Sequence, residues 1–293
     1  MTFTDVETAR KTYYEKFKKD LLISVIITLI FGVVFSILIP FFGIVVAIIV
    51  FGMSYIFTSY FTNQYRVAYR KAYKGYFIER NLNKIFKNVI YDHEKGFSSA
   101  VVRESRMVQL ADKFASNDLT LAKYKNIAFA QADVAIIRVH TDSDGHTHEY
   151  AIFKGRYMIF EFPKKFDYRL EIIGKKFNAY SIPGKIGNRK MIKLETESVD
   201  FNRNFKIFGQ DDFESFYLLD PAVIAKIEDI AAHYNHKLLL GFYDNRLVVA
   251  LDDGKDSFEP PKFSKPIDEK AEMQKVYTDI KVITDFVDII SKE

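Results

Sequence analysis

Three histidines and two aspartates stand close together between residues 140 and 148 of this 293-residue chain. They are His140, Asp142, Asp144, His146 and His148. Imidazole and carboxylate side chains at such close spacing are able to hold a divalent metal ion. The same segment contains small polar residues and a glycine, a composition typical of an exposed hairpin tip. We favour the solvated turn, and we predict no metal site and no cofactor.

A second candidate for chemistry is a basic loop that contains glycines. Lys185, Arg189 and Lys190 lie around Gly184 and Gly187, and loops of this kind are able to bind an anion such as phosphate. A solvated turn explains the same residues, and we favour it. Four further acidic residues could in principle supply a catalytic acid and base, but their spacing does not select two of them. They are Asp200, Asp211, Asp212 and Glu214.

Familiar catalytic motifs are absent from the sequence. It lacks a glycine-rich phosphate loop, a His-Glu-x-x-His zinc helix, a nucleophile elbow and a dinucleotide fingerprint. The chain has no cysteine, which excludes disulfides, thiolate metal ligands and thiol nucleophiles. We therefore predict no catalytic residue, and the sequence favours a binding protein over an unrecognised enzyme.

The most informative element is an uncharged run of 45 residues from Leu21 to Tyr65. One membrane helix needs about 20 apolar residues, so the run is long enough for two. Pro40 and Gly43 predict a turn between membrane spans at about 21–39 and 44–61. We therefore predict that residues 1–65 form a transmembrane helical hairpin that anchors the chain.

Small residues recur at every fourth position of the first predicted span. They are Ser24, Thr28, Gly32 and Ser36. Small side chains on one helix face allow a second helix to approach closely. We favour packing between the two helices of the hairpin over a seam for a partner helix.

Basic residues flank both ends of the uncharged run. Residues 66–90 carry seven Lys and Arg against one Glu, a net charge of +6. Because Lys and Arg resist translocation, both termini are predicted to be cytoplasmic. The basic excess beside the membrane favours contact with anionic lipid and argues against nucleic acid. The membrane-contact candidates are Arg66, Arg70, Lys71 and Lys74.

An aromatic stripe at spacing four follows the second predicted span and consists of Tyr65, Tyr69, Tyr73 and Phe77. This periodicity predicts that the helix continues to about Val89, inside a basic juxtamembrane segment of residues 66–95. Lipid or another copy of the chain could cover the stripe. We favour docking on the chain's own soluble domain.

Residues 96–293 are predicted to form a cytoplasmic α+β domain, with a mainly antiparallel sheet and packing helices. Alternation and turn residues predict strands at 127–139, 150–162, 168–173, 190–195, 204–208 and 213–219. Asp220-Pro221 predicts the start of a helix, and Asp244-Asn245 predicts a hairpin turn between strands at 238–243 and 246–251. The apolar spacing in residues 276–290 predicts a C-terminal amphipathic helix.

Several blocks of the sequence resemble a bacterial family of membrane proteins catalogued as a domain of unknown function. The blocks are Ile152-Phe153-Lys154-Gly155, the stretch 197–221, Phe258-Glu259-Pro260, and an earlier pair at Asp112-Lys113-Phe114 and Asp118-Leu119. The resemblance covers about residues 20–290. It departs where the family has an Arg before a Tyr, because Phe216 precedes Tyr217 here. The resemblance implies a membrane hairpin in the bacterial inner membrane and a LemA-type membrane protein as partner, but no established activity.

Two functions of different class follow from these observations. The first is a membrane-anchored interaction or scaffold protein that binds another protein through its cytoplasmic domain, and it leaves homo-oligomerisation open. The second is a sensor of anionic lipid or of a small anion. A deep pocket that gathers charged side chains would favour an enzyme, and an apolar surface would favour the scaffold.

The predicted topology leads to a labelling experiment. Because basic residues flank the hairpin and its turn carries none, cysteines introduced singly at Thr4 and Ser291 should resist membrane-impermeant thiol reagents in intact cells. Both should react after the cells are permeabilised. Labelling of either position in intact cells would contradict the topology.

Overall fold

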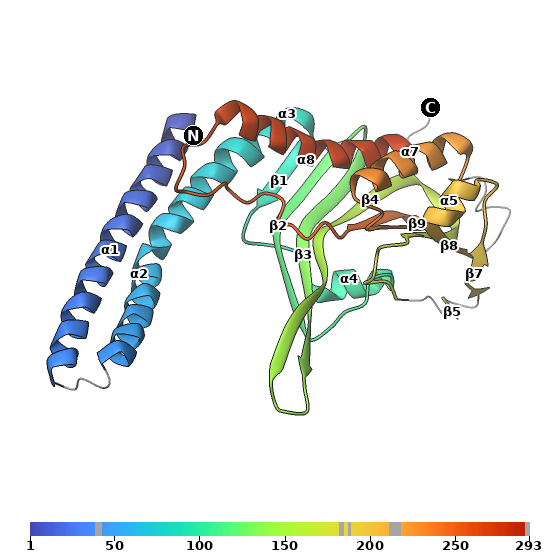
Figure 1. The fold of residues 1–293 in the computed structure, drawn as a ribbon. Coiled ribbons are helices and arrows are strands. Elements are labelled where there is room, and N and C mark those ends of the chain that lie inside the picture. The colour runs from blue at the N-terminus through green and yellow to red at the C-terminus, as the bar shows by residue number, and fades with distance from the viewer. Residues whose placement is uncertain (39–42, 182–184, 187–188, 211–217, 291–293) are drawn as a thin grey trace. The chain divides into compact units, whose positions relative to one another are not determined.

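The structure is a computed structural model that describes residues 1–38, 43–181, 185–186, 189–210 and 218–290 (Figure 1). It divides into two compact units. The helical unit comprises residues 1–81 and 259–276, and the sheet unit comprises residues 82–258 and 277–293. Each unit is described by itself.

Two long helices dominate the helical unit. Helix α1 spans Phe3–Leu38 and α2 spans Gly43–Tyr73. Thr2 and Asp5 cap the start of α1 reciprocally, because each backbone amide donates to the other's side-chain oxygen. The predicted turn at Pro40-Phe41-Phe42-Gly43 falls on residues 39–42, which lie outside the described residues.

Small polar side chains join α1 to α2. The hydroxyl oxygens of Ser24 and Thr58 lie 2.7 Å apart, and the Ser24 hydroxyl also donates to the carbonyl of Ser54. Thr28 donates to the Ser24 carbonyl of its own helix. Within the described residues, no helix has a stretch that combines the length and the apolar character needed to cross a membrane.

The aromatic stripe packs inside the helical unit. Tyr69 donates to the carbonyl of Pro261 at 3.2 Å, and Tyr73 donates to the Glu272 carboxylate at 2.6 Å. Phe77 is fully buried and contacts the ring of Phe3. Pro261 and Glu272 belong to the predicted soluble domain, so docking of the stripe on that domain is confirmed for Tyr69 and Tyr73. It is not confirmed by Phe77, whose contact is with α1.

Helical conformation ends earlier than the sequence predicts. A π-helical turn, η1 (Lys74–Glu79), follows α2, and helix α3 spans Arg80–Ile85. The predicted helix to Val89 is wrong at its end, because residues Lys87–Asp92 form strand β1 and pair with the next strand.

The larger sheet of the sheet unit is entirely antiparallel. Its strands are β1, β2 (Lys113–Tyr124), β3 (Ile127–Thr141), β4 (Thr147–Gly174), β7 (Ile192–Leu194), β8 (Phe205–Gly209) and β9 (Leu238–Leu251). Their order is β1-β2-β3-β4-β8-β7, and β9 pairs with β4. Strands β5 (Lys185–Ile186) and β6 (Arg189–Lys190) form a separate pair. The predicted α+β class with a mainly antiparallel sheet is confirmed.

Helices cover the two faces of this sheet (Figure 1). Helix α4 (Ser99–Ser105) lies against one face. Helix α7 (Pro221–His233) and the second part of α8 (Glu269–Ile290) lie against the other, and Asp220 caps α7 as predicted. The short helix α5 (Val199–Asn204) precedes β8.

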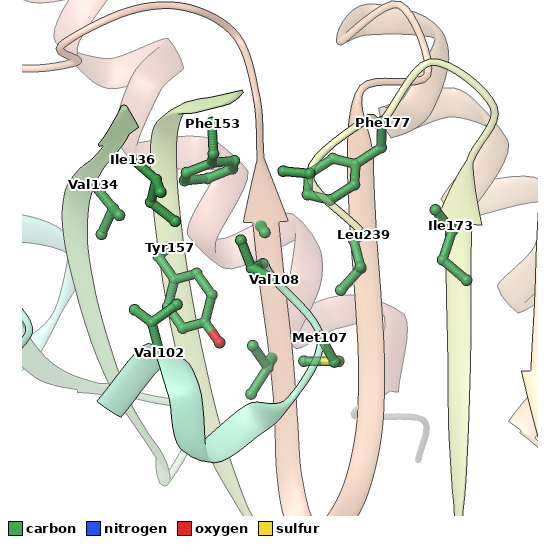
Figure 2. Close-up of a cluster of buried hydrophobic side chains, with 13 residues drawn as sticks. Val102, Met107, Val108, Val134, Ile136, Phe153, Tyr157, Ile173, Phe177 and Leu239 are labelled. Carbon is green, nitrogen blue, oxygen red and sulfur yellow. The ribbon is translucent and has the colours of Figure 1, made fainter. Parts of the chain in front are cut away.

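The core on the α4 side is a cluster of apolar side chains (Figure 2). Val102, Met107 and Val108, from α4 and the segment after it, pack onto side chains that point from β3, β4 and β9. A Cβ at Gly241 would lie 1.9 Å from the sulfur of Met107, so a larger residue there would force this buried side chain to shift. This cluster holds α4 against one half of the sheet.

The predicted hairpin at Asp244-Asn245 is wrong. Residues 238–251 form the single strand β9, which pairs with β4 along its length, from Ile173 opposite Leu239 to Arg156 opposite Leu251. The register shifts near Asp244, whose φ is +51°. The extra residues at these shifts lie on β4, between Glu161 and Phe166 and between Phe166 and Leu170. Strand β9 therefore continues through its turn-forming residues while β4 bulges opposite them.

Other predicted strands agree in part. The strands predicted at 127–139, 150–162 and 168–173 are confirmed, although the last two belong to β4. The strand at 204–208 is β8, and the one at 190–195 corresponds to β6 and β7. The strand at 213–219 falls mainly on residues 211–217, outside the described residues. Strands β1 and β2 and helix α4 were not predicted.

One buried side chain connects the sheet to both helices on its second face. Arg156 of β4 is 1% exposed. Its guanidinium donates to the carbonyl of Asp279 in α8 at 2.6 Å and to the hydroxyl of Tyr234, at the end of α7, at 2.9 Å. The preceding Gly155 belongs to a signature block, and a Cβ there would lie 2.0 Å from the Leu251 carbonyl oxygen.

Replacing Arg156 with Met should weaken the sheet unit. The change removes a charged donor from two buried acceptors, so we expect the free energy of unfolding to fall by about 2–4 kcal/mol. Chemical denaturation followed by circular dichroism measures it. Arg203→Met, at an exposed arginine paired with Asp200, should change stability by less than about 0.5 kcal/mol. Equal effects of the two substitutions would contradict this role for Arg156.

Candidate functional site

The candidate site is a hollow of about 450 Å³ on the sheet face that carries α4. We name it the alanine groove, and its central lining residues are Leu121, Lys123, Ala128, Ala130, Ile159 and Glu161. Val101 and Glu104 of α4 close one end of it, and Asn88 of β1 lies at the opposite end. Every lining residue belongs to the sheet unit.

Strand register explains how these side chains meet. Leu121 of β2 is opposite Ala130 of β3, which is opposite Ile159 of β4. Residues directly opposite each other in an antiparallel sheet share a face, so these three form an apolar row across the sheet. The row extends to Ile90 on β1 and to Val248 on β9, which lies beneath α4.

A second, charged row runs beside the apolar one. Lys123, Ala128, Glu161 and Arg246 follow one another from β2 to β9, and Lys87 of β1 is opposite Lys123. The apolar row thus meets solvent next to a row of ionisable side chains. Such a mixture of apolar floor and polar rim is common at binding surfaces.

The hollow exists because β3 presents alanines at its centre. Ala128 and Ala130 have single methyl groups, whereas the neighbouring strands place Leu121, Ile159 and Glu161 at the same level. Further along the same face, Val134 and Ile136 fill the space under α4. The groove is therefore the part of this sheet face where small residues remain and the helix has ended.

An ion-pair cluster closes the β9 side of the groove. The Arg246 guanidinium lies 3.3 Å from a Glu104 oxygen and 3.5 Å from a Glu161 oxygen. Burial acts to lower the pKa of Arg246, but Tyr243, Glu161 and Glu104 outweigh it and raise the pKa. These partly exposed pairs contribute little to stability, about 0.2–1 kcal/mol each. One guanidinium faces two carboxylates here, so this side of the groove carries a formal net charge of −1.

A separate pocket of about 400 Å³ gathers charged residues of both signs, among them Arg106, Asp167 and Arg169. Arg169 is 5% exposed. Its guanidinium donates to the Glu171 carboxylate at 2.5 Å and to the carbonyl of Ser105, and it lies over the ring of Tyr243. Burial raises the pKa of Glu171, although Arg169 opposes the rise. Arg169 thereby holds the C-terminal end of α4 in place, so its donors are used within the fold.

Buried acids lie on the opposite sheet face. Asp133 accepts the backbone amide of Ser257 at 2.7 Å and the Ser257 hydroxyl at 3.1 Å. Burial raises the pKa of Asp133 well above its ordinary value, the Ser257 amide opposes this, and Asp256 and Asp118 raise it further. Asp118 accepts from Tyr91 and Asn117. These contacts organise the loop before Phe258.

The histidine-rich segment is the exposed tip of the β3–β4 hairpin. His140 and His148 are opposite each other, and His148 Nε2 lies 3.4 Å from an Asp142 oxygen. Asp142 also accepts the amides of Asp144 and His146, which makes a tight turn. The hairpin turn that the sequence predicts is confirmed.

The predicted anion-binding residues are described only in part. Lys185 is opposite Lys190, and Ile186 is opposite Arg189, in the β5–β6 pair. The side chains of Lys185 and Arg189 lie outside the described residues, and Lys190 is exposed. Of the four acidic residues considered as a possible acid and base pair, Asp200 forms an ion pair with Arg203. The other three, Asp211, Asp212 and Glu214, lie outside the described residues.

The membrane-contact candidates divide into two pairs. Arg70 and Lys74 both bind the Glu259 carboxylate, at 2.5 Å and 3.2 Å, and Lys74 is only 2% exposed. Burial acts to raise the pKa of Glu259, but Arg70 and Lys74 lower it overall. Arg66 and Lys71 are exposed on the same helix. Arg70 is also 48% exposed, so Lys74 is the buried member of the four candidates.

The helix-packing candidates are placed as follows. Ser24 lies in the contact between α1 and α2, and Thr28 bonds along its own helix. Gly32 is half-buried, and the side chain of Ser36 lies outside the described residues.

Part of the chain is similar to a protein family of unknown function. A model described as "Protein of unknown function (DUF3137)" matches residues 151–292, which begin in β4 and run past α8. No curated protein matches the chain. The crystal structure of the mycobacterial trehalose monomycolate transport factor A, TtfA, aligns with a TM-score of 0.40 and 8% identity, covering 76% of this chain and 94% of that one. At that similarity we transfer nothing from TtfA to this protein.

Sequence reasoning missed the alanine groove. The signal that could have revealed it is the alternation of alanine at positions 128, 130 and 132 of a strand otherwise rich in larger apolar residues. Alternating alanines form a hollow only where larger residues of neighbouring elements surround them, and the neighbouring elements β2 and α4 were not predicted.

We expect the hairpin tip to bind no transition metal tightly, because its exposed imidazoles have no buried partners to orient them. Isothermal titration of the purified chain with zinc should give no stoichiometric site, and His146→Ala with His148→Ala should leave the titration unchanged. Stoichiometric zinc that disappears in the double variant would show that the tip is a metal site.

Proposed function

We propose that this protein is a membrane-anchored interaction protein that binds a polypeptide partner in the alanine groove. The observation that carries the proposal is the groove itself, an open hollow with an apolar floor that the fold does not fill. Leu121 is 38% exposed and Ile90 is 63% exposed within the row that continues from its floor. Apolar side chains that remain exposed in one row favour a binding surface.

The anchoring part of the proposal rests on the uncharged run Leu21–Tyr65. Large apolar side chains of this run are exposed in the helical unit, including Leu29, Ile37 and Ile56. The run is continuous in the sequence and includes residues 38–44, whose side chains lie outside the described structure. A two-helix anchor with cytoplasmic termini at the bacterial inner membrane agrees with the basic flanks.

An enzyme is the weaker alternative. The pocket at Arg169 gathers charges, but its central pair is satisfied by the protein's own groups. A lipid sensor draws support from Arg66 and Lys71, which are exposed next to the uncharged run. The groove fits an apolar protein segment better than a lipid headgroup, because its centre is two alanine methyl groups. A LemA-type membrane protein is the first partner to test.

Site-specific photo-crosslinking in cells tests this function. A photoreactive amino acid at Leu121 should crosslink to a discrete protein, whereas the same group at Tyr150, an exposed aromatic residue on the projecting hairpin, should not. Ala130→Leu should reduce the Leu121 crosslink at least about tenfold, because the added side chain fills the hollow. The thermal unfolding temperature of Ala130→Leu controls for folding.

Three outcomes would decide against the proposal. They are no protein adduct at Leu121, equal adducts at Leu121 and Tyr150, or an adduct that Ala130→Leu leaves intact. Identification of the crosslinked protein by mass spectrometry then tests the LemA-type partner.

A further inference from the structure

Two lysines stand directly opposite each other at the open side of the alanine groove. Lys87 of edge strand β1 is the register partner of Lys123 of β2. Like charges at directly opposite positions of a sheet destabilise it. Within the described part of the chain, neither lysine forms an ion pair, and both are exposed. The fold thus holds an uncompensated positive pair beside an apolar hollow.

A bulge in β1 brings this pair onto the face of the groove. The register advances three residues on β1, from Lys87 to Ile90, against two on β2, from Lys123 to Leu121. Asn88, with φ of +55°, sits in the irregularity and lines the groove. One extra residue keeps both Lys87 and Ile90 on the groove's face. The lysine pair and the exposed isoleucine are therefore neighbours on one surface.

The two sides of the groove differ in net charge. On the β9 side, Arg246 faces two carboxylates, those of Glu104 and Glu161, so the formal net charge is −1. On the β1 side, the two lysines face each other. A ligand that lies across the alanines therefore meets a net negative rim on the β9 side and a positive rim on the β1 side. The complement of this pattern is a bulky apolar group followed on one side by negative charge.

We propose that the partner segment of the alanine groove is a polypeptide with a bulky apolar anchor followed on one side by acidic residues. This inference rests on the proposed function and specifies the chemistry of the partner. The anchor lies over Ala128 and Ala130, between Leu121 and Ile159. A carboxylate next to it meets Lys87 and Lys123 and relieves their repulsion.

Labelled peptides test the partner's chemistry against the full chain in nanodiscs of zwitterionic lipid. The probe carries a Leu-Phe pair followed on one side by Glu residues. One control peptide has Lys in place of Glu, and another has Ser in place of Leu-Phe. Fluorescence anisotropy should show about tenfold tighter binding of the Glu peptide than of the Lys peptide, and no binding of the Ser peptide.

Charge-reversal variants assign the preference to the lysine pair. Lys87→Glu with Lys123→Glu should reverse the order of the two peptides. Lys206→Glu with Lys255→Glu makes the same change of charge at exposed lysines outside the groove and should leave the order unchanged. Ala130→Leu should abolish binding of both peptides. Lys123→Glu alone should raise the unfolding temperature, because it turns a repulsive cross-strand pair into an attractive one.

Each alternative outcome has a defined meaning. Equal binding of the Glu and Lys peptides, both lost in Ala130→Leu, would leave the groove's function intact and overturn its acid preference. A Glu preference that persists in the double reversal would also overturn it. If no peptide binds but the crosslink in cells remains specific to the groove, the partner chemistry proposed here is refuted and the proposed function stands. Binding to anionic vesicles that is lost in Lys87→Glu with Lys123→Glu, and that the Glu peptide does not displace, would assign the pair to lipid.

Discussion

Strand β4 is the element on which the sheet unit depends. Over 28 residues it pairs with β3 along its first part, with β8 along its last, and with β9 from Arg156 to Ile173. The register of every other strand of the sheet is set directly or indirectly by these pairings. A single long strand therefore determines which side chains share a face, including those of the groove, because facing alternates with each residue.

Two buried arginines of β4 fix the helices on the two faces of the sheet. Arg156 bonds to α8 and to the end of α7, and Arg169 bonds to the end of α4 and to Glu171. Buried guanidinium groups need partners on several sides, and each of these finds backbone carbonyls and tyrosine groups there. The helices are thus oriented by polar contacts in addition to apolar packing. That orientation determines where α4 ends and where the groove begins.

Local signals in the sequence predicted the elements whose identity does not depend on distant residues. Asp220-Pro221 marked the start of α7 correctly, since a cap acts within one turn of helix. Alternation identified β3 and much of β4. Asp244-Asn245 was misread, because turn chemistry also fits a strand that lies opposite a bulge, and only the length of β4 decides between them. The groove could not be predicted, since it arises from small residues of β3 beside larger ones on strands far apart in the sequence.

The alanines of the groove floor have a consequence for how this protein can change over time. Core positions such as Val134 and Ile136 are constrained by the side chains packed on them. Ala128 and Ala130 face open space on their groove side, so larger residues there alter the shape of the hollow without displacing a neighbour. On the proposed function, partner choice and folding stability are encoded at different positions of one strand. A single substitution at Ala128 or Ala130 would then exchange one partner for another and keep the same core.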